Sequence, residues 1–379
     1  MTDSPAARPD PFEAGFPTDP DAITPEVMTA LLQTVSPDVE VTAVTVRKAW
    51  TYGSGEKVST AGRLDLGLTY AGEGASSLPA QMVLKINLVE LPVAPLYRNE
   101  VAAYTHLRPA EVTRTPRCFG GYFDEATGSF GLALDDLAAQ GAVFPSVRDH
   151  VSLGSLESLL GSIAALHCHN WGPDVDWESP QLAWAQSHTE GELHELFFDP
   201  GLVPLVIEDQ VATWQHKREL CQMVGETPAT LNAKVIALQR HQATLPQTLC
   251  HGDLHVGNTY LLPDQSMGIL DWQLSSRGYY MHDVAYAIVT SLDVATRRAE
   301  ERRLVELHRR ELLRHGASDV PTAQEAFDEY RRAVAWGAYI GWLTTPVDNY
   351  GWEINVANHL RLFTAYRDLD TAAAIADIS

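Results

Sequence analysis

The sequence predicts an α+β protein of two lobes, in which a small lobe built on an antiparallel β-sheet precedes a larger, mainly helical lobe. Up to about residue 137, apolar and polar residues alternate in short runs, as in strands with one buried face. Beyond about residue 147, apolar residues recur with the period of a helix. A chain of 379 residues is long enough for two such cores. The expected divisions are an arm at 1–20, the first lobe at 21–137 and the second lobe at 138–379.

The predicted strands of the first lobe are short runs rich in β-branched and apolar residues. The first two, 41–50 and 63–70, flank a glycine- and serine-rich turn at 51–62 that is typical of a hairpin connection. The third strand, 80–88, carries one lysine, Lys85, inside an apolar run. One helix and two further strands are expected after it. These elements fall at 95–107, 118–124 and 128–137.

The second lobe contains segments with the apolar spacing of amphipathic helices and one short interruption. The interruption, at 259–262 and 267–272, has the pattern of a small β-hairpin. A connector at 137–146 joins the two lobes, and the chain has no internal repeat. The segments with helical spacing are 155–171, 202–223, 228–244, 297–316 and 326–343.

The acidic composition narrows the classes of partner. A formal net charge of -22 disfavours non-specific binding to nucleic acid or to an anionic membrane surface. It is compatible with a cationic ligand, although an acidic surface more often serves solubility alone. The chain contains no run of about 18 apolar residues of the kind that spans a membrane. We therefore expect neither a nucleic acid nor a membrane as a partner.

The N-terminal segment and the cysteines favour a cytoplasmic protein. Segment 1–20 lacks the basic and apolar regions of a signal peptide, and its Pro, Asp and Ala content predicts a poorly ordered arm. The cysteines are scattered and form no C-x-x-C pair, which favours reduced thiols over a disulfide framework or a zinc site. They are Cys118, Cys168, Cys221 and Cys250.

Three polar residues form the pattern that phosphoryl transfer uses. Asp253 and Asn258 lie in the segment LCHGDLHVGNTY at 249–260, and Asp271 follows across the predicted hairpin. One carboxylate must orient the attacking hydroxyl and accept its proton, and we assign this role to Asp253. The Asn258 amide and the Asp271 carboxylate are hard oxygen ligands that suit Mg²⁺ on nucleotide phosphates. His251 is expected to support the loop, and His255 has no assigned chemical role.

The first lobe supplies candidate groups for a nucleotide. A lysine in an apolar strand is costly to bury without a partner, and Glu100 on the next predicted helix is placed to pair with Lys85. Gly53 and Gly55 in the hairpin turn would let backbone N–H groups approach the phosphates. The end of the last predicted strand, at 134–137, falls where an inter-lobe hinge would offer backbone groups to adenine.

Several motifs resemble those of one enzyme superfamily. The segments HGDLHVGN (251–258), ILDW (269–272) and LALDDL (132–137) resemble the aminoglycoside phosphotransferase and choline kinase branch of the protein-kinase-like superfamily. The segment at 160–171 is similar to a helix of the ecdysteroid-kinase-like members. The resemblance covers about 50–290 and implies the bilobal protein-kinase-like fold. It also implies ATP and Mg²⁺ as cofactors, and transfer of the γ-phosphoryl group to a hydroxyl of a small molecule.

The resemblance also implies roles for residues at matching positions. Asp253 becomes the catalytic base, Asn258 and Asp271 bind the metal, and Asp283 braces the catalytic loop. The other implied roles are a phosphate-binding pair, backbone contacts to adenine, and an acceptor pocket in the helical lobe. The candidates are Lys85 and Glu100 for the pair, Asp135 and Leu137 for adenine, and Trp336, Tyr339 and Tyr350 for the pocket.

Two departures from the protein-kinase pattern bear on these roles. The turn GSGEKVSTAG does not have the G-x-G-x-x-G spacing, which leaves Ser59 or Thr60 as an additional candidate for phosphate contact. Asp271 is followed by Trp272 and Gln273 in place of Phe-Gly, which separates the chain from protein kinases.

Two other classes of function fit part of the sequence. The D-x-H pattern of Asp253 and His255 also opens the motif set of metallophosphoesterases, but the downstream ligands of that set are missing. A nucleotide-binding module without catalysis normally lacks the lysine, the base or the metal carboxylate, and all three are present here. The acceptor stays open between a cationic alcohol, such as an aminoglycoside or choline-like compound, and an apolar one, such as a sterol or terpenoid.

Overall fold

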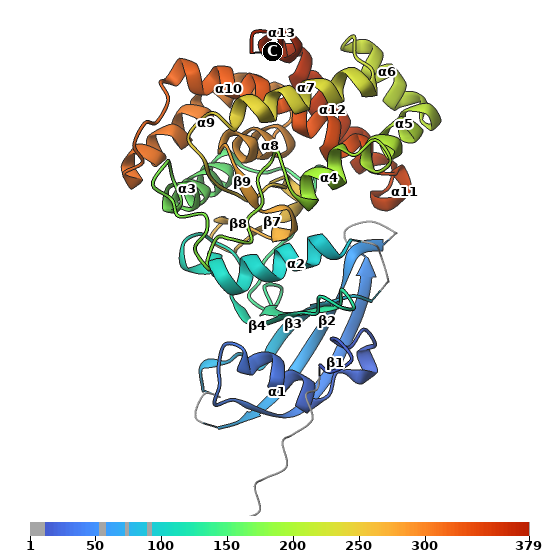
Figure 1. Ribbon diagram of the computed structural model, residues 1–379, viewed down its shortest axis with the longest axis vertical. Helices are drawn as coiled ribbons and strands as arrows, with labels where there is room; N and C mark the ends of the chain where they lie inside the picture. Colours follow the sequence, from blue (N-terminus) through green and yellow to red (C-terminus); the bar gives the residue numbers. More distant parts are fainter. Residues whose placement is uncertain (1–11, 53–57, 73–75, 89–92, 379) are drawn as a thin grey trace, which may run out of the picture.

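The computed structural model describes residues 12–52, 58–72, 76–88 and 93–378, which form two lobes (Figure 1). The N-terminal lobe contains a five-stranded antiparallel sheet with the strand order β1-β2-β3-β5-β4. The predicted α+β class and the two-lobed arrangement are therefore confirmed. The strands are β1 (Glu40–Tyr52), β2 (Val58–Ala71), β3 (Gln81–Ile86), β4 (Cys118–Phe123) and β5 (Phe130–Asp135).

The two faces of this sheet are covered differently, as the alternation of apolar residues requires. One face packs on α1 (Pro25–Gln33) through a core that includes Leu64, Leu66 and Leu84. The other face turns toward α2 (Ala94–Ala102), which lies between the sheet and the helical lobe in Figure 1. The second face therefore borders the cleft between the lobes.

Part of the segment predicted as an N-terminal arm packs on the first lobe. Residues 1–11 lie outside the described part of the chain, but Phe12 and Phe16 are buried against the first lobe. The rings of Phe12 and Tyr122 are 4.4 Å apart, and the Phe16 amide donates a hydrogen bond to Ser129 Oγ at 2.7 Å. The expectation of a poorly ordered arm is wrong for 12–20, because two aromatic anchors outweigh the polar composition around them.

The C-terminal lobe is mainly helical and has one core centred on α8, whose residues are all buried. Two short strand pairs, β6 with β9 and β7 with β8, belong to this lobe, and β7 and β8 lie on its side toward the N-terminal lobe (Figure 1). The strands are β6 (Thr248–Cys250), β7 (Thr259–Leu261), β8 (Met267–Ile269) and β9 (Ser276–Gly278). The helices are α3 (Leu153–His169), α4 (Glu192–Phe198), α5 (Val203–Thr213), α6 (Gln215–Met223), α7 (Pro228–Gln242), α8 (Met281–Ser291), α9 (Val294–His315), α10 (Ala323–Trp336), α11 (Val347–Tyr350), α12 (Trp352–Asp368) and α13 (Thr371–Ala376).

Two predicted helices differ from those in the structure. The segment 202–223 divides into α5 and α6, because Trp214 adopts an extended backbone between them. In the segment 326–343, α10 ends at Trp336 and a π-helical turn, η7 (Gly337–Gly341), follows. A Cβ atom at Gly341 would lie 2.3 Å from the Tyr286 hydroxyl, so this turn needs glycine to pack on α8.

All four cysteines are free thiols, as predicted. No helix in the described part of the chain combines the length and the apolar character that crossing a membrane demands.

Replacing Phe16 with alanine should lower the free energy of unfolding by about 3–5 kcal/mol, because the substitution leaves a cavity at a buried aromatic anchor. Urea unfolding followed by circular dichroism measures this loss. Val35→Ala is the control, since Val35 is 42% exposed and should change stability by less than about 0.5 kcal/mol. Equal stability of Phe16→Ala and the wild type would show that residues 12–20 do not anchor to the sheet.

Candidate active site

The loop between β6 and β7 carries Asp253 and Asn258 and passes very close to the segment after β8. Gly252 has a φ of +85°, and a Cβ atom at this position would lie 1.9 Å from the Leu274 carbonyl oxygen. Only glycine fits this approach without moving the backbone. The tight turn brings the following residue, Asp253, to the cleft between the lobes.

Asp283 on α8 holds this loop from below. One carboxylate oxygen accepts hydrogen bonds from the His251 amide at 2.6 Å and from His167 Nε2 at 3.1 Å. The other oxygen accepts from the Gly252 amide at 2.9 Å. Burial alone would raise the pKa of Asp283, but the hydrogen bond from His167 and the neighbouring imidazoles hold the pKa below its ordinary value. The predicted bracing residue thus lies under the loop as a buried carboxylate.

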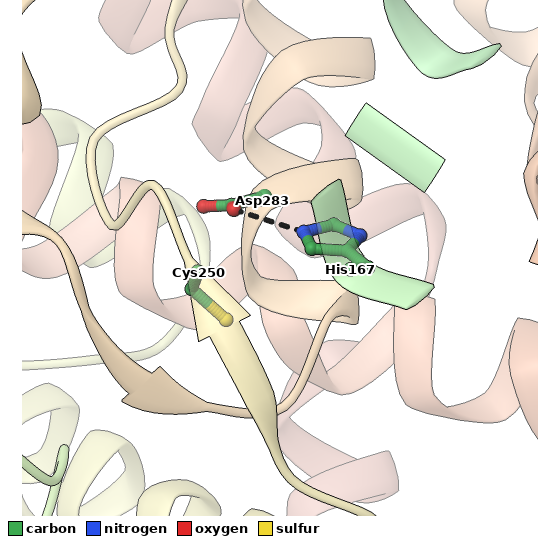
Figure 2. A group of neighbouring side chains, drawn as sticks. All are labelled: His167, Cys250 and Asp283. Atoms are coloured by element: carbon green, nitrogen blue, oxygen red, sulfur yellow. Dashed lines mark hydrogen bonds and ion pairs between the residues drawn. The ribbon is translucent and has the colours of Figure 1, made fainter. Parts of the chain in front are cut away.

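His167, Cys250 and Asp283 lie close enough together to suggest a metal site (Figure 2). The two nitrogens of His167 already face Asp283 and His308, at 3.1 Å each. Burial raises the pKa of the Cys250 thiol well above its ordinary value, so the metal-binding thiolate is disfavoured. Hydrogen bonds account for the positions of His167 and Asp283, and we interpret the group as support for the loop.

His251 is fully buried within the loop. Its Nε2 atom contacts the Leu270 carbonyl oxygen at 2.9 Å, and its ring lies 5.0 Å from the Trp272 ring with an edge-to-face geometry. Burial lowers the pKa of His251 and favours the neutral imidazole, whose Nε2–H donates to Leu270. His251 therefore holds the loop against Leu270 and Trp272, as expected of a supporting residue.

Asp253, Asn258 and Asp271 meet at the cleft. Asn258 Nδ2 donates to the Asp253 carboxylate at 3.0 Å and to its backbone carbonyl at 2.9 Å. Asp271 follows β8 in the left-handed backbone region, with a φ of 68°. Burial and the negative charge of Asp271 raise the pKa of Asp253 well above its ordinary value. The two carboxylates therefore share one electrostatic environment that a cation would relieve.

Lys85 connects this group to the first lobe. Its ammonium lies 2.6 and 2.8 Å from the two oxygens of Glu100 and 3.2 Å from Asp271 Oδ1. Lys85 and Glu100 are 4% and 1% exposed, so the pair is buried. Burial would raise the pKa of Asp271, but the charge of Lys85 lowers it and keeps the carboxylate ionised. The predicted pair of Lys85 and Glu100 is present within the first lobe, and the contact of Lys85 with Asp271 reaches across the cleft.

The predicted nucleotide contacts fall partly outside the described residues. Gly53 and Gly55 lie there, and so does the side chain of Ser59 at the start of β2. Asp135 ends β5, and its carboxylate accepts hydrogen bonds from the backbone amide and the guanidinium of Arg117. Leu137 is buried at the start of the connector between the lobes, and most residues from 138 to 144 are exposed. The segment predicted to contact adenine is thus at the hinge.

The three candidates for the acceptor pocket lie in different places. Tyr350 is 36% exposed. Burial and the charges of Asp253 and Asp271 raise its pKa to about 12, so Tyr350 lies within electrostatic reach of both carboxylates. Trp336 lines a small pocket together with His188, Phe197 and Gly252. Tyr339 is 1% exposed, and burial and the charge of Glu208 on α5 raise its pKa. The structure brings only Tyr350 to the carboxylate pair.

Further aromatic residues near the carboxylates were missed by sequence reasoning. The His255 ring lies 5.7 Å from Tyr286 and 6.0 Å from Trp342, and Trp342 lies 5.8 Å from Tyr350. Burial and the charge of Asp253 raise the pKa of Tyr286. The available signal was the position of Tyr286 on α8, three residues after Asp283. We call these four rings the aromatic wall.

This fold and this site define a phosphotransferase with the protein-kinase-like architecture. The model of the phosphotransferase enzyme family, APH, matches residues 69–318, which is more than half of the 379 residues, and the chain belongs to this family. Its resemblance to the aminoglycoside phosphotransferase and choline kinase branch is therefore confirmed. A search of curated proteins finds no match.

Solved structures with the same fold include two small-molecule kinases. A choline kinase from Cryptosporidium parvum has a TM-score of 0.54 and 14% identity, over 90% of this chain and 92% of that chain. An ethanolamine kinase from Plasmodium vivax has a TM-score of 0.50 and 11% identity, over 88% of this chain and 84% of that chain. At these identities the likeness shows the fold.

Three histidines with lowered pKa values predict a loss of stability on mild acidification. Burial lowers the pKa of His255 to about 4, and the pKa values of His188 and His359 are lowered to about 3. Below pH ~6.5 these histidines become protonated in the unfolded chain but stay neutral in the folded chain. The free energy of unfolding should therefore fall by about 1.4 kcal/mol per pH unit for each histidine between roughly pH 6 and 4.

Urea unfolding between pH 7 and pH 4.5 measures this slope. In His255→Gln the slope should be smaller by about 1.4 kcal/mol per pH unit, while the exposed His150→Gln keeps the wild-type slope. An unchanged slope in His255→Gln would mean that His255 is protonated in the folded protein.

Proposed function

We propose that this protein transfers the γ-phosphoryl group of ATP to a hydroxyl of a small organic acceptor, with Mg²⁺ bound to the nucleotide. One observation carries the proposal. Asp253, Asn258 and Asp271 from the helical lobe meet Lys85 from the sheet in one cluster at the inter-lobe cleft. Membership of the phosphotransferase family supports the reaction class, and the hinge position of Asp135 and Leu137 supports a nucleotide between the lobes.

Asp253 orients the acceptor and takes its proton. The acceptor oxygen attacks the γ-phosphorus as its hydroxyl proton passes to the Asp253 carboxylate. The bond between the γ-phosphorus and the oxygen that bridges it to the β-phosphate breaks, and ADP leaves. The raised pKa of Asp253 strengthens the carboxylate as a base, and the Asn258 amide holds the side chain in place at 3.0 Å.

Asn258 and Asp271 would hold Mg²⁺, since amide and carboxylate oxygens are the ligands that this cation prefers. The fit rests on the charge of the site. The negative charge of Asp271 raises the pKa of Asp253, and a bound cation would relieve this repulsion. When bound, the metal neutralises charge on the phosphates. Lys85, held by Glu100 and facing Asp271, places a second positive charge at the same end of the nucleotide.

The acceptor would enter beside the aromatic wall. His255 and Tyr350 are partly exposed there, and the buried rings of Tyr286 and Trp342 pack against them. Aromatic rings contact apolar frames and cationic groups alike. The solved structures with the same fold include a choline kinase and an ethanolamine kinase, so amino alcohols belong in the first panel of acceptors.

A screen of ATP consumption tests the function. Amino alcohols, aminoglycosides, sugars and apolar alcohols are offered with Mg-ATP, and the phosphorylated product is identified by mass spectrometry. We expect a product with one of these classes. Stabilisation by Mg-ATP without turnover on any acceptor would favour a binding module, and phosphoester hydrolysis with Mn²⁺ and no nucleotide would favour a metallophosphoesterase.

Asp253→Asn should lower kcat by about 10²–10⁴-fold, because the base is removed, while the Kd of Mg-ATP changes by less than about threefold. Steady-state kinetics and calorimetric titration measure the two quantities. Asp264→Asn is the matched control, an exposed aspartate on the β7–β8 hairpin that should behave as the wild type. Near-normal turnover by Asp253→Asn would exclude Asp253 as the base.

Asp271→Ala should act on nucleotide binding instead. Because the variant lacks a metal ligand, the Kd of Mg-ATP should rise by at least about tenfold, and the dependence of binding on Mg²⁺ should weaken. Titration of ATP at several Mg²⁺ concentrations measures this effect. An unchanged Mg²⁺ dependence would remove Asp271 from the metal site.

A further inference from the structure

A second cationic side chain lies next to Lys85 on the sheet. Arg63 on β2 pairs in register with Lys85 on β3, and directly opposed residues of an antiparallel pair point to the same face. Their neighbours Leu64 and Leu84 are also paired and are buried on the opposite face, under α1. Arg63 therefore extends from the cleft face of the sheet, where it is half-buried.

The charge of Lys85 is already balanced within the protein. Glu100 and Asp271 lie within 3.2 Å of its ammonium. Among the described residues, no carboxylate lies within ion-pair distance of Arg63. Its guanidinium nevertheless lies within electrostatic reach of three groups of the site. Burial raises the pKa values of Glu100 and Tyr350 and acts in the same direction on Asp271, and the charge of Arg63 partly opposes this effect at each.

These neighbours locate Arg63 along the nucleotide. Adenine is expected at the hinge near Asp135, whose register partner on β3 is Met82, three residues before Lys85. Arg63 lies opposite Lys85, so it is farther from the hinge than Met82 is. Tyr350 is within electrostatic reach of both Arg63 and Asp253. This position corresponds to the end of the nucleotide where the terminal phosphate meets the acceptor.

We propose that Arg63 binds the γ-phosphoryl group and stabilises its charge during transfer. The inference rests on the proposed function and adds a residue that the sequence motifs did not indicate. A guanidinium donates several N–H groups in a planar fork, which suits the oxygens of a phosphoryl group better than a lysine ammonium does. In this arrangement Lys85 binds the inner phosphates, and Arg63 binds the γ-phosphoryl group that is transferred to the acceptor.

The test compares nucleotides that differ in the γ-phosphate. The Kd values of Mg-ADP and of Mg-AMPPNP, a non-hydrolysable ATP analogue, are measured by calorimetry for the wild type, Arg63→Gln and Arg63→Lys. In Arg63→Gln the Kd of Mg-AMPPNP should rise by about 10- to 100-fold, while that of Mg-ADP changes by less than about threefold. Arg63→Lys should recover part of the loss, since it keeps the charge without the fork.

The controls separate this role from a structural one. Arg310→Gln removes an arginine whose side chain is 74% exposed on α9, and it should leave both Kd values unchanged. Thermal unfolding of each variant without nucleotide shows whether the fold is kept. With an acceptor found by the screen, kcat of Arg63→Gln should fall by a similar 10- to 100-fold.

Two results would overturn the inference. Equal weakening of Mg-ADP and Mg-AMPPNP in Arg63→Gln would place Arg63 at the inner phosphates or in a structural role. Unchanged affinity for both nucleotides with unchanged kcat would remove it from the site. Failure of the wild-type protein to bind either nucleotide would instead refute the proposed function, and the inference with it.

Discussion

The Lys85 ammonium lies between the carboxylates of Glu100 and Asp271, and this contact joins the two lobes at the candidate active site. Burying a lysine is unfavourable unless its charge is compensated, so β3, α2 and the segment after β8 must be placed together. The strand presents Lys85 to the cleft, α2 turns Glu100 toward it, and the left-handed backbone of Asp271 directs the third group inward. The geometry of the cleft follows from this one requirement.

A second buried carboxylate supports the helical side of the cleft. Asp283 binds two successive backbone amides of the loop and one imidazole, which leaves the loop little freedom. Because Gly252 also passes directly against the Leu274 carbonyl, Asp253 is held by backbone geometry on both sides. The base is thus positioned by groups that do not take part in the reaction themselves, as pre-organised sites require.

Much of this arrangement could be predicted from residue spacing alone. The separation of Asp253, Asn258 and Asp271 reflects a local loop and hairpin, so short-range sequence carries it. The pairing of Lys85 with Glu100 could also be predicted, because a lysine inside an apolar strand needs a partner. The two-lobed division followed from the change of apolar period near 137–147.

Other features depend on contacts that spacing does not reveal. Arg63 joins the site only through the register of β2 with β3, which a single sequence does not specify. Tyr339 and Tyr350 both fit an aromatic helix pattern. Tyr339 lies in the π-helical turn and is buried in the core, whereas Tyr350 follows a short loop and is exposed at the cleft. The packing of Phe12 and Phe16 on the sheet likewise arises from tertiary contacts.

We propose that Asp253, Asn258 and Asp271 form a site for a metal held together with nucleotide phosphates. Electron paramagnetic resonance of Mn²⁺ added with AMPPNP tests it most directly, because coupling to ³¹P shows that metal and phosphate are in contact. We predict one ³¹P-coupled Mn²⁺ per chain in the wild type and its loss when Asn258 and Asp271 are both replaced by alanine. Mn²⁺ that binds tightly without nucleotide, or that binds without ³¹P coupling, would contradict the account.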